Sequence, residues 1–390
     1  MVKIFEEPKL TSISISGGDA LKNDEFIHEP VNICSGVFVD SSNDFGETVD
    51  ASDCYVLPGI IDVHGDAFER SIQPRPNVDF PLPIALADVD RQLIANGITT
   101  AYHGLTVSWE PGLRSYEAAA NFRTHLKALR ETFASDMHLN IRWETFALNH
   151  VKDMIDWVQD DPKSILSLND HTTAYLDLPK TSSKISRMAG RSGLSEDQCK
   201  TLINQVWERR NDVPAAIEAI CAGARDAGCS VFAHDELTPE TRTEHRRLGV
   251  SVSEFPMTIA TAKSAAEEGE HVVLGAPNIV RGGSQNNAID ARESVASGHC
   301  TVLASDYYYP APLIAAFKLV DDGVLPLEKA WNLISKNAAE AAKLADRGEI
   351  AEGMRADCIL VDKKTRNIRI VIANGQVKYT FNSGDPSHRV

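Results

Sequence analysis

A regular alternation of short apolar runs and helical segments constrains the fold of this 390-residue chain more than any other feature. The runs are bounded by turn-forming residues, as is typical of buried strands. The stretches between them, such as 116–133 and 214–227, repeat apolar residues at helical spacing. The expected strands are 56–63, 99–102, 139–145, 165–168, 230–233, 250–253, 272–274 and 301–304. Alternating units of this kind form parallel sheets covered by helices, so the chain is expected to be α/β, with a (β/α)8 TIM-like barrel.

Both ends of the chain differ from this central part. Residues 11–16 and 31–39 are short alternating runs broken by Gly, Asn, Asp and Ser, which is typical of strands joined by turns. After residue 350, similar runs flank Asn374-Gly375, a hairpin signal. We therefore expect 1–55 and 350–390 to form one composite small β domain, a β-sandwich, with 56–349 as the barrel.

A polar stretch after the fourth expected strand interrupts the alternation. Residues 180–210 contain seven Lys or Arg and three Asp or Glu. Loops that follow barrel strands face the active end, so an insertion at about 172–212 would lie over that end. A solvated helix pair is the ordinary explanation for such a charge run. The alternative is a basic lid over an anionic substrate.

Composition excludes several classes of protein. The 39 Lys and Arg against 55 Asp and Glu give a net charge of −16, whereas general nucleic-acid binding needs a basic face. The seven cysteines are odd in number and form no CxxC pair, which fits a reducing compartment. The chain begins without the apolar segment of a signal peptide and has no apolar stretch long enough to span a membrane. We expect a cytoplasmic protein with no nucleic-acid or membrane partner.

Polar side chains that suit a metal ion follow several of the expected strands. The carboxyl ends of barrel strands converge and carry the catalytic groups in this architecture. A single His or Asp at such a position is more often a structural residue or a helix cap. Three imidazoles and three carboxylates together favour a metal site. The candidate ligands are His64, Asp66, Glu144, His171, His234 and Asp306.

Their spacing suggests how they would share the metal. His64 and Asp66 are two residues apart, so on a regular strand both side chains point to one side and could bind one ion. The pair of later histidines could bind a second ion, with Glu144 between the two at the usual spacing of about 3.5–4 Å. Asp306 could bind metal and accept the proton of the attacking water. Imidazole and carboxylate ligands favour Zn²⁺, with Mn²⁺, Fe²⁺ or Ni²⁺ as alternatives, at one or two ions per chain.

Two loops carry groups suited to an anion. A glycine-rich segment follows the seventh expected strand, and its backbone amides and arginine could approach an anion closely. A second arginine lies in a proline-rich loop after the first strand. An ordinary flexible loop and a rigid barrel-closing loop are the alternatives, and the P-loop pattern is absent. The candidate substrate-binding residues are Arg75, Asp235, Arg281, Gly282, Gly283 and Ser284.

The two ends of the expected barrel resemble a known superfamily. Residues 56–64 (VLPGIIDVH) and 353–360 (GMRADCIL) resemble the opening strand and the closing segment of the amidohydrolase superfamily. Most members continue with His-x-His, whereas this chain has Asp66 at the second position. Many members carry a bridging lysine that is absent here, and the resemblance makes Glu144 its natural substitute.

A narrower resemblance runs through nearly the whole chain. Its motifs are HGD at 64–66, PRPNVD at 74–79, SLNDH at 167–171, AHD at 233–235, GAPNIVRGGS at 275–284 and SDYY at 305–308. In this order they resemble the α-D-ribose 1-methylphosphonate 5-triphosphate diphosphatase family of the carbon–phosphorus lyase pathway. The resemblance implies hydrolysis of a ribosyl 5-triphosphate to the 5-phosphate and pyrophosphate. Asp306 would take the proton of the attacking water, and Arg75 and Arg281 would help to spread the charge on pyrophosphate.

Two other functions are consistent with the same residues. An amidohydrolase of the common kind would use the same metals and Asp306 to attack a carbon–nitrogen bond in a deacetylase, deaminase or cyclic amidase reaction. A barrel that has lost its metal would act as a scaffold, although the full ligand set argues against this. The expected partner is a small phosphorylated sugar, with self-association into a homo-oligomer as an open alternative.

Overall fold

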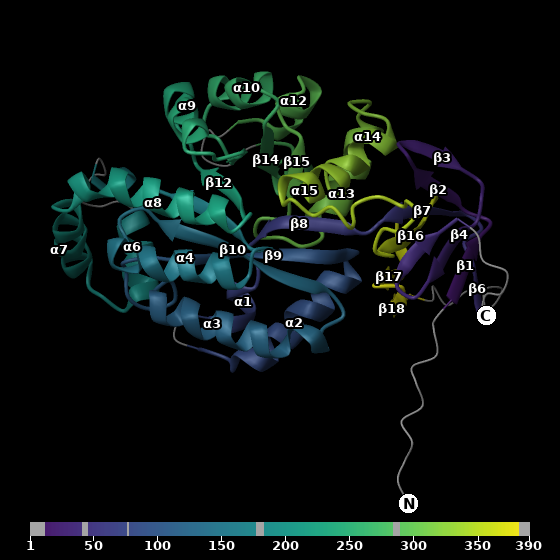
Figure 1. Cartoon of the computed structure of the whole chain (residues 1–390), viewed down its shortest axis with the longest axis horizontal. Helices are drawn as coiled ribbons and strands as arrows, with labels where there is room; N and C mark the ends of the chain where they lie inside the picture. Colours follow the sequence, from purple (N-terminus) through teal and green to yellow (C-terminus); the bar gives the residue numbers. More distant parts are fainter. Residues whose placement is uncertain (1–11, 41–45, 76–77, 177–182, 284–288, 382–390) are drawn as a thin grey trace, which may run out of the picture.

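The computed structural model of the chain describes residues 12–40, 46–75, 78–176, 183–283 and 289–381 (Figure 1). Of the candidate site residues, Ser284 lies outside these ranges. The barrel occupies most of the molecule, and the strands from the two ends of the chain lie together at one end of it (Figure 1).

Eight parallel strands form the central sheet, in the order of the chain. They are β8 (Ile60–Gly65), β9 (Ile98–Val107), β10 (Asp136–Glu144), β11 (Ile165–Asn169), β12 (Ser230–His234), β13 (Val252–Glu254), β14 (His271–Gly275) and β15 (Val302–Ala304). A bridge between Gly65 and Asp306 joins the first strand to the segment after the last, so the barrel is nearly closed. The (β/α)8 prediction is confirmed.

Helices lie between the strands and cover the outside of the barrel. They are α1 (Glu69–Ile72), α2 (Leu82–Ala95), α3 (Tyr116–Leu129), α4 (Val151–Asp160), α5 (His171–Leu176), α6 (Ser183–Ser192), α7 (Glu196–Trp207), α8 (Val213–Asp226), α9 (Pro239–Arg247), α10 (Ile259–Glu267), α11 (Ala276–Arg281), α12 (Ala291–Ala296), α13 (Ala311–Asp321), α14 (Leu327–Asn332) and α15 (Lys336–Ala341). Short 3-10 turns lie at η1 (Arg130–Thr132), η2 (Leu148–His150) and η3 (Arg210–Asp212).

The helix α3 illustrates why these segments are helical. Ser115 caps its first turn by accepting a hydrogen bond from the Ala118 amide. Ala119, Phe122 and Leu126 are buried at helical spacing and pack on the barrel. In the described part of the chain, no helix has the length and apolar character needed to cross a membrane.

The first expected strand, 56–63, is two strands in two different sheets. Strand β7 (Cys54–Pro58) pairs with β16 (Cys358–Asp362) outside the barrel, and β8 begins the barrel. Gly59 separates them because the chain passes very close to the next strand. A Cβ at this position would lie 2.3 Å from the Thr99 hydroxyl oxygen. The continuous apolar run in the sequence conceals this break.

The remaining strands form two sheets from both ends of the chain. One has the order β5-β4-β1-β6 and the other β18-β17-β16-β7-β2-β3. They comprise β1 (Ser12–Ser16), β2 (Asp19–Lys22), β3 (Glu25–Ile27), β4 (Val31–Cys34), β5 (Val37–Val39), β6 (Glu47–Asp50), β17 (Ile368–Ala373) and β18 (Gln376–Thr380). Ile13 and Ile33 of the first sheet share a buried core with Val56 and Leu360 of the second. The prediction of β structure built from both termini is confirmed.

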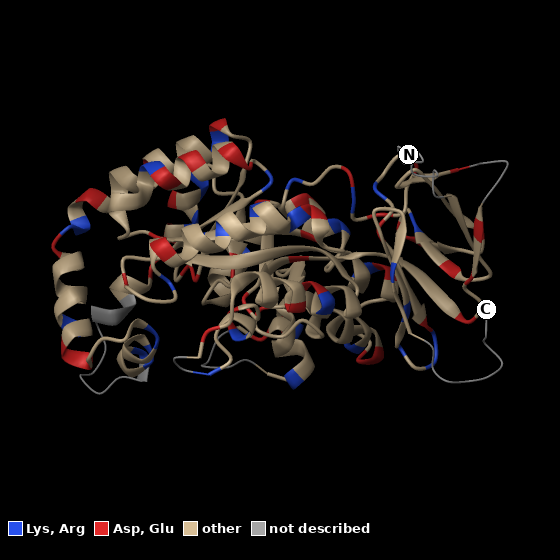
Figure 2. Ribbon diagram, turned by 90° about the horizontal axis from the view of Figure 1, so that it is seen from below, with Lys and Arg blue, Asp and Glu red and all other residues tan. Residues whose placement is uncertain are grey.

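The basic insertion contains a helix pair with a small core of its own. Met188 of α6 packs with Cys199 and Ile203 of α7, and Trp109 from the barrel packs against them. At least part of its positive charge is matched, because Arg191 pairs with Glu110 at 2.5 Å. Figure 2 shows basic and acidic residues interspersed along the helices around the barrel.

The amino end of the barrel is closed by a buried arginine. Arg347, whose residue is 3% exposed, donates to Asp136 Oδ2 at 2.7 Å and to the Thr100 hydroxyl at 3.0 Å. Its Nε also donates to Asp346 at 2.8 Å. Two carboxylates therefore match the one guanidinium.

Candidate active site

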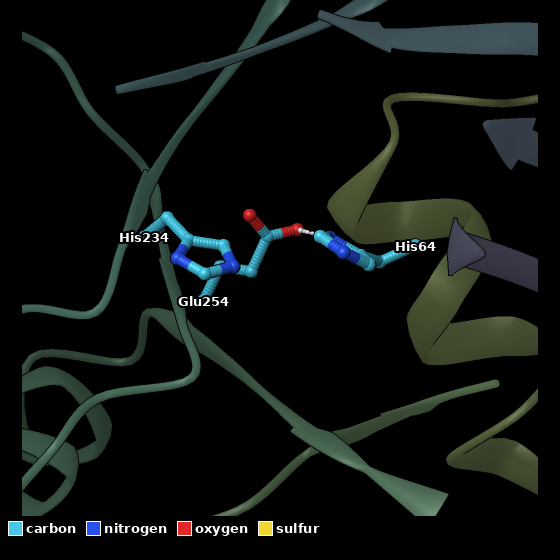
Figure 3. Close-up of side chains that lie close together, drawn as sticks. All are labelled: His64, His234 and Glu254. Atoms are coloured by element: carbon cyan, nitrogen blue, oxygen red, sulfur yellow. Dashed lines mark hydrogen bonds and ion pairs between the residues drawn. The ribbon is translucent and has the colours of Figure 1, made fainter. Parts of the chain in front are cut away.

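Three side chains converge inside the carboxyl end of the barrel. His64 is the last residue but one of β8, His234 ends β12 and Glu254 ends β13. Their ligand atoms all lie within 4.8 Å of one another, and Figure 3 shows the two imidazole rings on either side of the Glu254 carboxylate. We call these three residues the central triad. Two of them are predicted ligands, whereas Glu254 is not among the residues that the sequence assigns.

Hydrogen bonds hold the Glu254 carboxylate in place. Oε1 accepts from Asn140 Nδ2 at 2.9 Å and lies 2.8 Å from His64 Nδ1. Oε2 accepts from the Ser167 hydroxyl at 3.0 Å. Burial opposes the ionisation of Glu254, but the neighbouring His64 lowers the pKa of this carboxyl to about 2. Burial likewise opposes a positive charge on His64, yet Glu254 raises the pKa of its imidazole above the ordinary value.

The central triad fits a divalent metal ion. Two imidazoles and one carboxylate are a common protein ligand set at catalytic zinc, which leaves a coordination position for water or substrate. His64 and Glu254 are fully buried among fixed polar partners, and such partners orient metal ligands. The geometry brings these three donors close enough to share one ion.

A second group lies beside the central triad. His171 Nδ1 is 2.5 Å from Glu144 Oε1, and the His171 backbone amide donates to Glu144 Oε2 at 3.2 Å. Asp235 Oδ2 is 3.9 Å from His171 Nε2 and 3.3 Å from His234 Nδ1. Glu144 raises the pKa of His171, and His171 in turn lowers the pKa of Glu144 against the effect of burial. Glu144 therefore pairs with His171, one of the two histidines expected at a second ion.

Asp66 and Asp306 form a third group at the closure of the barrel. The Asp66 amide donates to the Asp306 carbonyl at 2.8 Å, and the Asp306 amide donates to the His64 carbonyl at 2.9 Å. Strand β8 ends at Gly65 after a register irregularity, so Asp66 lies just beyond the regular strand that carries His64. Burial, with the charge of Asp66 adding to it, raises the pKa of Asp306 to about 6.

A buried carboxylate fixes the segment that carries Asp306. Asp62 Oδ1 accepts from the Ser305 amide at 2.8 Å, and Oδ2 accepts from the Ser305 hydroxyl at 2.5 Å. Asp306 itself has a φ of 54°, a left-handed conformation that non-glycine residues rarely adopt. Asp62 thus acts as a positioning residue that the sequence interpretation missed.

Two further site residues come from β10, on the same face as Glu144. Asn140 contacts the central triad, and Arg142 Nη2 lies 3.2 Å from His234 Nε2 while its Nε donates to Asn169 Oδ1 at 3.3 Å. Alternate residues of a strand share one face. Counting back by two from Glu144 therefore indicates both residues, although the sequence interpretation did not use this signal.

The residues expected to bind substrate are placed differently from one another. Arg281 ends α11 and its Nη1 donates to the Tyr307 hydroxyl at 3.3 Å, next to Asp306 in the chain. The glycine-rich loop is the end of this helix, where the Gly282 and Gly283 amides donate to backbone carbonyls of the last turn. Both amides already donate hydrogen bonds within the helix end. Their binding of an anion therefore stays a prediction, and it would require these hydrogen bonds to break. Arg75 is exposed, and its backbone forms an isolated antiparallel β-bridge with Val78.

Comparison with known proteins identifies the relationship. No protein-family model matches the chain. It is 30% identical over 347 residues to alpha-D-ribose 1-methylphosphonate 5-triphosphate diphosphatase of Escherichia coli (strain K12), which covers 85% of this chain and 90% of that protein.

Solved structures share the fold at lower identity. A Xaa-Pro dipeptidase with bound methionine has a TM-score of 0.64 and 15% identity, and covers 95% of this chain and 100% of that one. An amidohydrolase has a TM-score of 0.62 and 16% identity, and covers 96% of this chain and 100% of that one. The beta-aspartyl dipeptidase of Fervidobacterium islandicum AW-1 has a TM-score of 0.61 and 16% identity, with coverages of 95% and 99%. The chain shares its fold with these structures, and it belongs to the alpha-D-ribose 1-methylphosphonate 5-triphosphate diphosphatase family of hydrolytic enzymes.

Proposed function

We propose that the chain hydrolyses the 5-triphosphate of a ribose carrying a 1-phosphonate ester, and yields the 5-phosphate and pyrophosphate. The similarity to the E. coli diphosphatase over 90% of its length is the observation that carries this proposal. The site supplies what the reaction requires, namely metal-binding side chains, a buried carboxylate and an arginine at one end of the barrel. The cysteines of the chain are all free, which fits a reducing compartment, so we place the enzyme in the cytoplasm.

The central triad would hold a divalent cation, with Asp66, His171 and Asp306 as further candidate ligands. Imidazole and carboxylate donors favour Zn²⁺ among the common ions. When bound, such a cation polarises a phosphoryl oxygen and lowers the pKa of water. Glu254 joins the candidate ligands because it faces both imidazoles, and the expected sharing of an ion by His64 and Asp66 remains part of the proposal.

Asp306 is the candidate general base. With a pKa of about 6 it is mostly ionised near pH 7 and still basic enough to accept a proton. The oxygen of water forms a bond to the α-phosphorus, and the bond from this phosphorus to the oxygen that bridges it to the β-phosphorus breaks. Pyrophosphate leaves with that electron pair, and the proton of water passes to Asp306. The hydrogen bonds between Asp62 and Ser305 fix the backbone segment that carries this carboxylate.

The side chain of Arg281 is a candidate for binding the departing pyrophosphate. It lies at the carboxyl end of the barrel beside Tyr307, and a guanidinium forms strong paired hydrogen bonds with phosphate oxygens. The insertion at 172–212 would act as a lid, and its basic residues would cover the polyphosphate of the bound substrate. Its pairing of Arg191 with Glu110 shows that some of this charge also stabilises the insertion itself.

Release of pyrophosphate is the direct test. The metal-loaded enzyme is assayed with α-D-ribose 1-methylphosphonate 5-triphosphate, with nucleoside triphosphates as a comparison panel. We expect one pyrophosphate per ribosyl 5-phosphate formed. Turnover of small amides without pyrophosphate release would establish carbon–nitrogen bond hydrolysis instead, and an inactive protein that binds no metal would establish a scaffold.

A further inference from the structure

Arg142 lies at the centre of the candidate active site without an established role. It projects from β10 into the barrel between Asn140, which contacts the central triad, and Glu144, which contacts His171. Gly104 on the neighbouring strand makes room for it. A Cβ at Gly104 would lie 3.2 Å from His64 Nε2 and 3.3 Å from Arg142 Cδ. The barrel therefore accommodates an imidazole and a guanidinium side by side at this level.

The hydrogen bonds of Arg142 differ from those of the other buried arginines. Among the described residues, three arginines are buried: Arg142 is 5% exposed, Arg242 0% and Arg347 3%. Arg242 pairs with Glu236 and Glu270, and Arg347 pairs with two aspartates. Within the same described ranges, Arg142 forms no ion pair with a carboxylate, and its hydrogen bonds go to an amide oxygen and an imidazole nitrogen. Its charge acts at longer range on the carboxylates of Glu144, Asp235, Glu254 and Asp306.

This pattern suits a cation that receives an anionic ligand. Taking a guanidinium out of water is costly unless a negative partner compensates for it. Because the guanidinium stays protonated, Arg142 is the donor to His234 Nε2, and the proton of that imidazole is then on Nδ1. Two of the five N–H donors of a guanidinium are used in this way, and a phosphoryl group could accept others in paired geometry.

We propose that Arg142 is a catalytic residue that donates hydrogen bonds to the nonbridging oxygens of the α-phosphoryl group while its anhydride bond breaks. This inference rests on the proposed diphosphatase function and adds a second positive centre beside the central triad. Charge that develops on the phosphoryl oxygens in the transition state meets a guanidinium already fixed by Asn169. A cation held by the central triad would use the same lone pair of His234 that accepts from Arg142, and this N–H group of Arg142 would then be available to substrate.

Substitution of Arg142 tests this role. For Arg142→Gln we expect kcat for pyrophosphate release to fall about 10²–10³-fold, with Arg142→Lys between this variant and the wild type. Metal content, measured by elemental analysis, should stay at the wild-type stoichiometry, and the metal dissociation constant should not rise, since a competing cation has been removed. Arg91→Gln is the matched control, because Arg91 is an exposed surface arginine with a side chain that is 74% exposed.

Chemical rescue separates a catalytic role from a structural one. We expect guanidinium at millimolar concentration to raise the activity of Arg142→Ala by at least tenfold in a saturable manner, and equal sodium chloride to have no effect. A rescue that fails in a folded, metal-loaded variant, or an Arg142→Gln enzyme within threefold of wild type, overturns the role of Arg142. Absence of pyrophosphate release by the wild type overturns the proposed function itself, so the two failures are distinct.

Discussion

The two ends of the barrel both bury charged side chains, but they match these charges differently. At the amino end, Arg347 is neutralised by Asp136 and Asp346. At the carboxyl end, Arg142 has neutral acceptors, and Asp306 keeps a raised pKa because burial and Asp66 disfavour its charge. The amino end therefore matches its buried arginine within the chain, whereas under the proposed function a cation and an anionic substrate would complete the carboxyl end.

Backbone conformation follows the same division. Asp235, Phe255 and Asp306 each follow a barrel strand at the carboxyl end and each have a positive φ, between 52° and 57°. A bulky residue such as Phe255 pays a conformational cost in this region, and such positions cluster at functional sites. The Phe255 ring meets both His64 and His234 edge to face, with centroids at 4.9 and 5.3 Å. The conformation therefore positions an apolar wall against the central triad.

The largest effect on activity should come from Asp306→Asn. Loss of a general base costs about 10²–10⁴-fold in kcat, and the substitution removes little volume. The measurement is steady-state pyrophosphate release at pH 8 by protein of equal metal content. Asp88→Asn on the surface of α2 serves as a matched control and should leave kcat unchanged. Activity retained within tenfold in Asp306→Asn would show that another group takes the proton.

At the opposite end, Arg347→Met should reduce stability and leave chemistry intact. Removing Arg347 leaves the largely buried Asp136 carboxylate with His138, at 3.0 Å, as its remaining partner. Breaking a buried pair in this way costs up to about 3–5 kcal/mol in the free energy of unfolding. Denaturant unfolding measures this loss, and kcat of the folded fraction should equal that of the wild type. Adding Asp136→Asn should restore part of the stability. A fall in kcat without a fall in stability would contradict the division between the two ends.

Glu254→Gln should weaken metal binding. The amide keeps the size of the side chain but supplies a poorer ligand, so we expect at least a 10–100-fold rise in the metal dissociation constant. Competition with a coloured chelator measures this constant directly. Glu236→Gln offers a comparison, because Glu236 is a buried carboxylate that pairs with Arg242 outside the barrel interior. Equal metal affinity in Glu254→Gln and the wild type would remove Glu254 from the central triad.

The smallest effect concerns the pH dependence of stability in metal-free protein. The pKa of Asp306 rises from an ordinary 3.8 to about 6 on folding, so its charge opposes the folded state. This penalty is absent below pH 3.8 and complete above pH 6. Asp306→Asn should therefore match the wild type near pH 4 and be more stable by about 1–3 kcal/mol at pH 8. Unfolding curves at the two pH values measure the difference in the free energy of unfolding. A wild type more stable than the variant at pH 8 would contradict this prediction.

The architecture was predictable because its signals are local. Apolar runs gave the eight barrel strands, and the polar residues that follow them gave the positions of His64, His171, His234 and Asp306. The split at Gly59 was not visible, since it depends on the close approach of Thr99 from another strand. The glycine-rich loop is the end of a helix that Pro277 and Gly282 signal at its start and end, a pattern that the sequence does contain.

The grouping of the site residues was harder to predict than their positions. Glu254 follows a strand like the other candidates, but its contact with His64 crosses the barrel between residues 190 positions apart. Such a contact depends on the closure of the barrel and on the irregular register of β8, neither of which a local sequence pattern shows. The roles of individual ligands, including Asp66 and Glu144, remain predictions that metal-binding measurements on single variants address.

The position of the bond that breaks tests the central proposal most directly. Hydrolysis is carried out in water enriched in ¹⁸O with the metal-loaded enzyme, and both products are analysed by mass spectrometry. Attack on the α-phosphorus at the carboxyl end of the barrel predicts one ¹⁸O atom in the ribosyl 5-phosphate and none in pyrophosphate. Label in pyrophosphate, or release of orthophosphate as the first product, would contradict it.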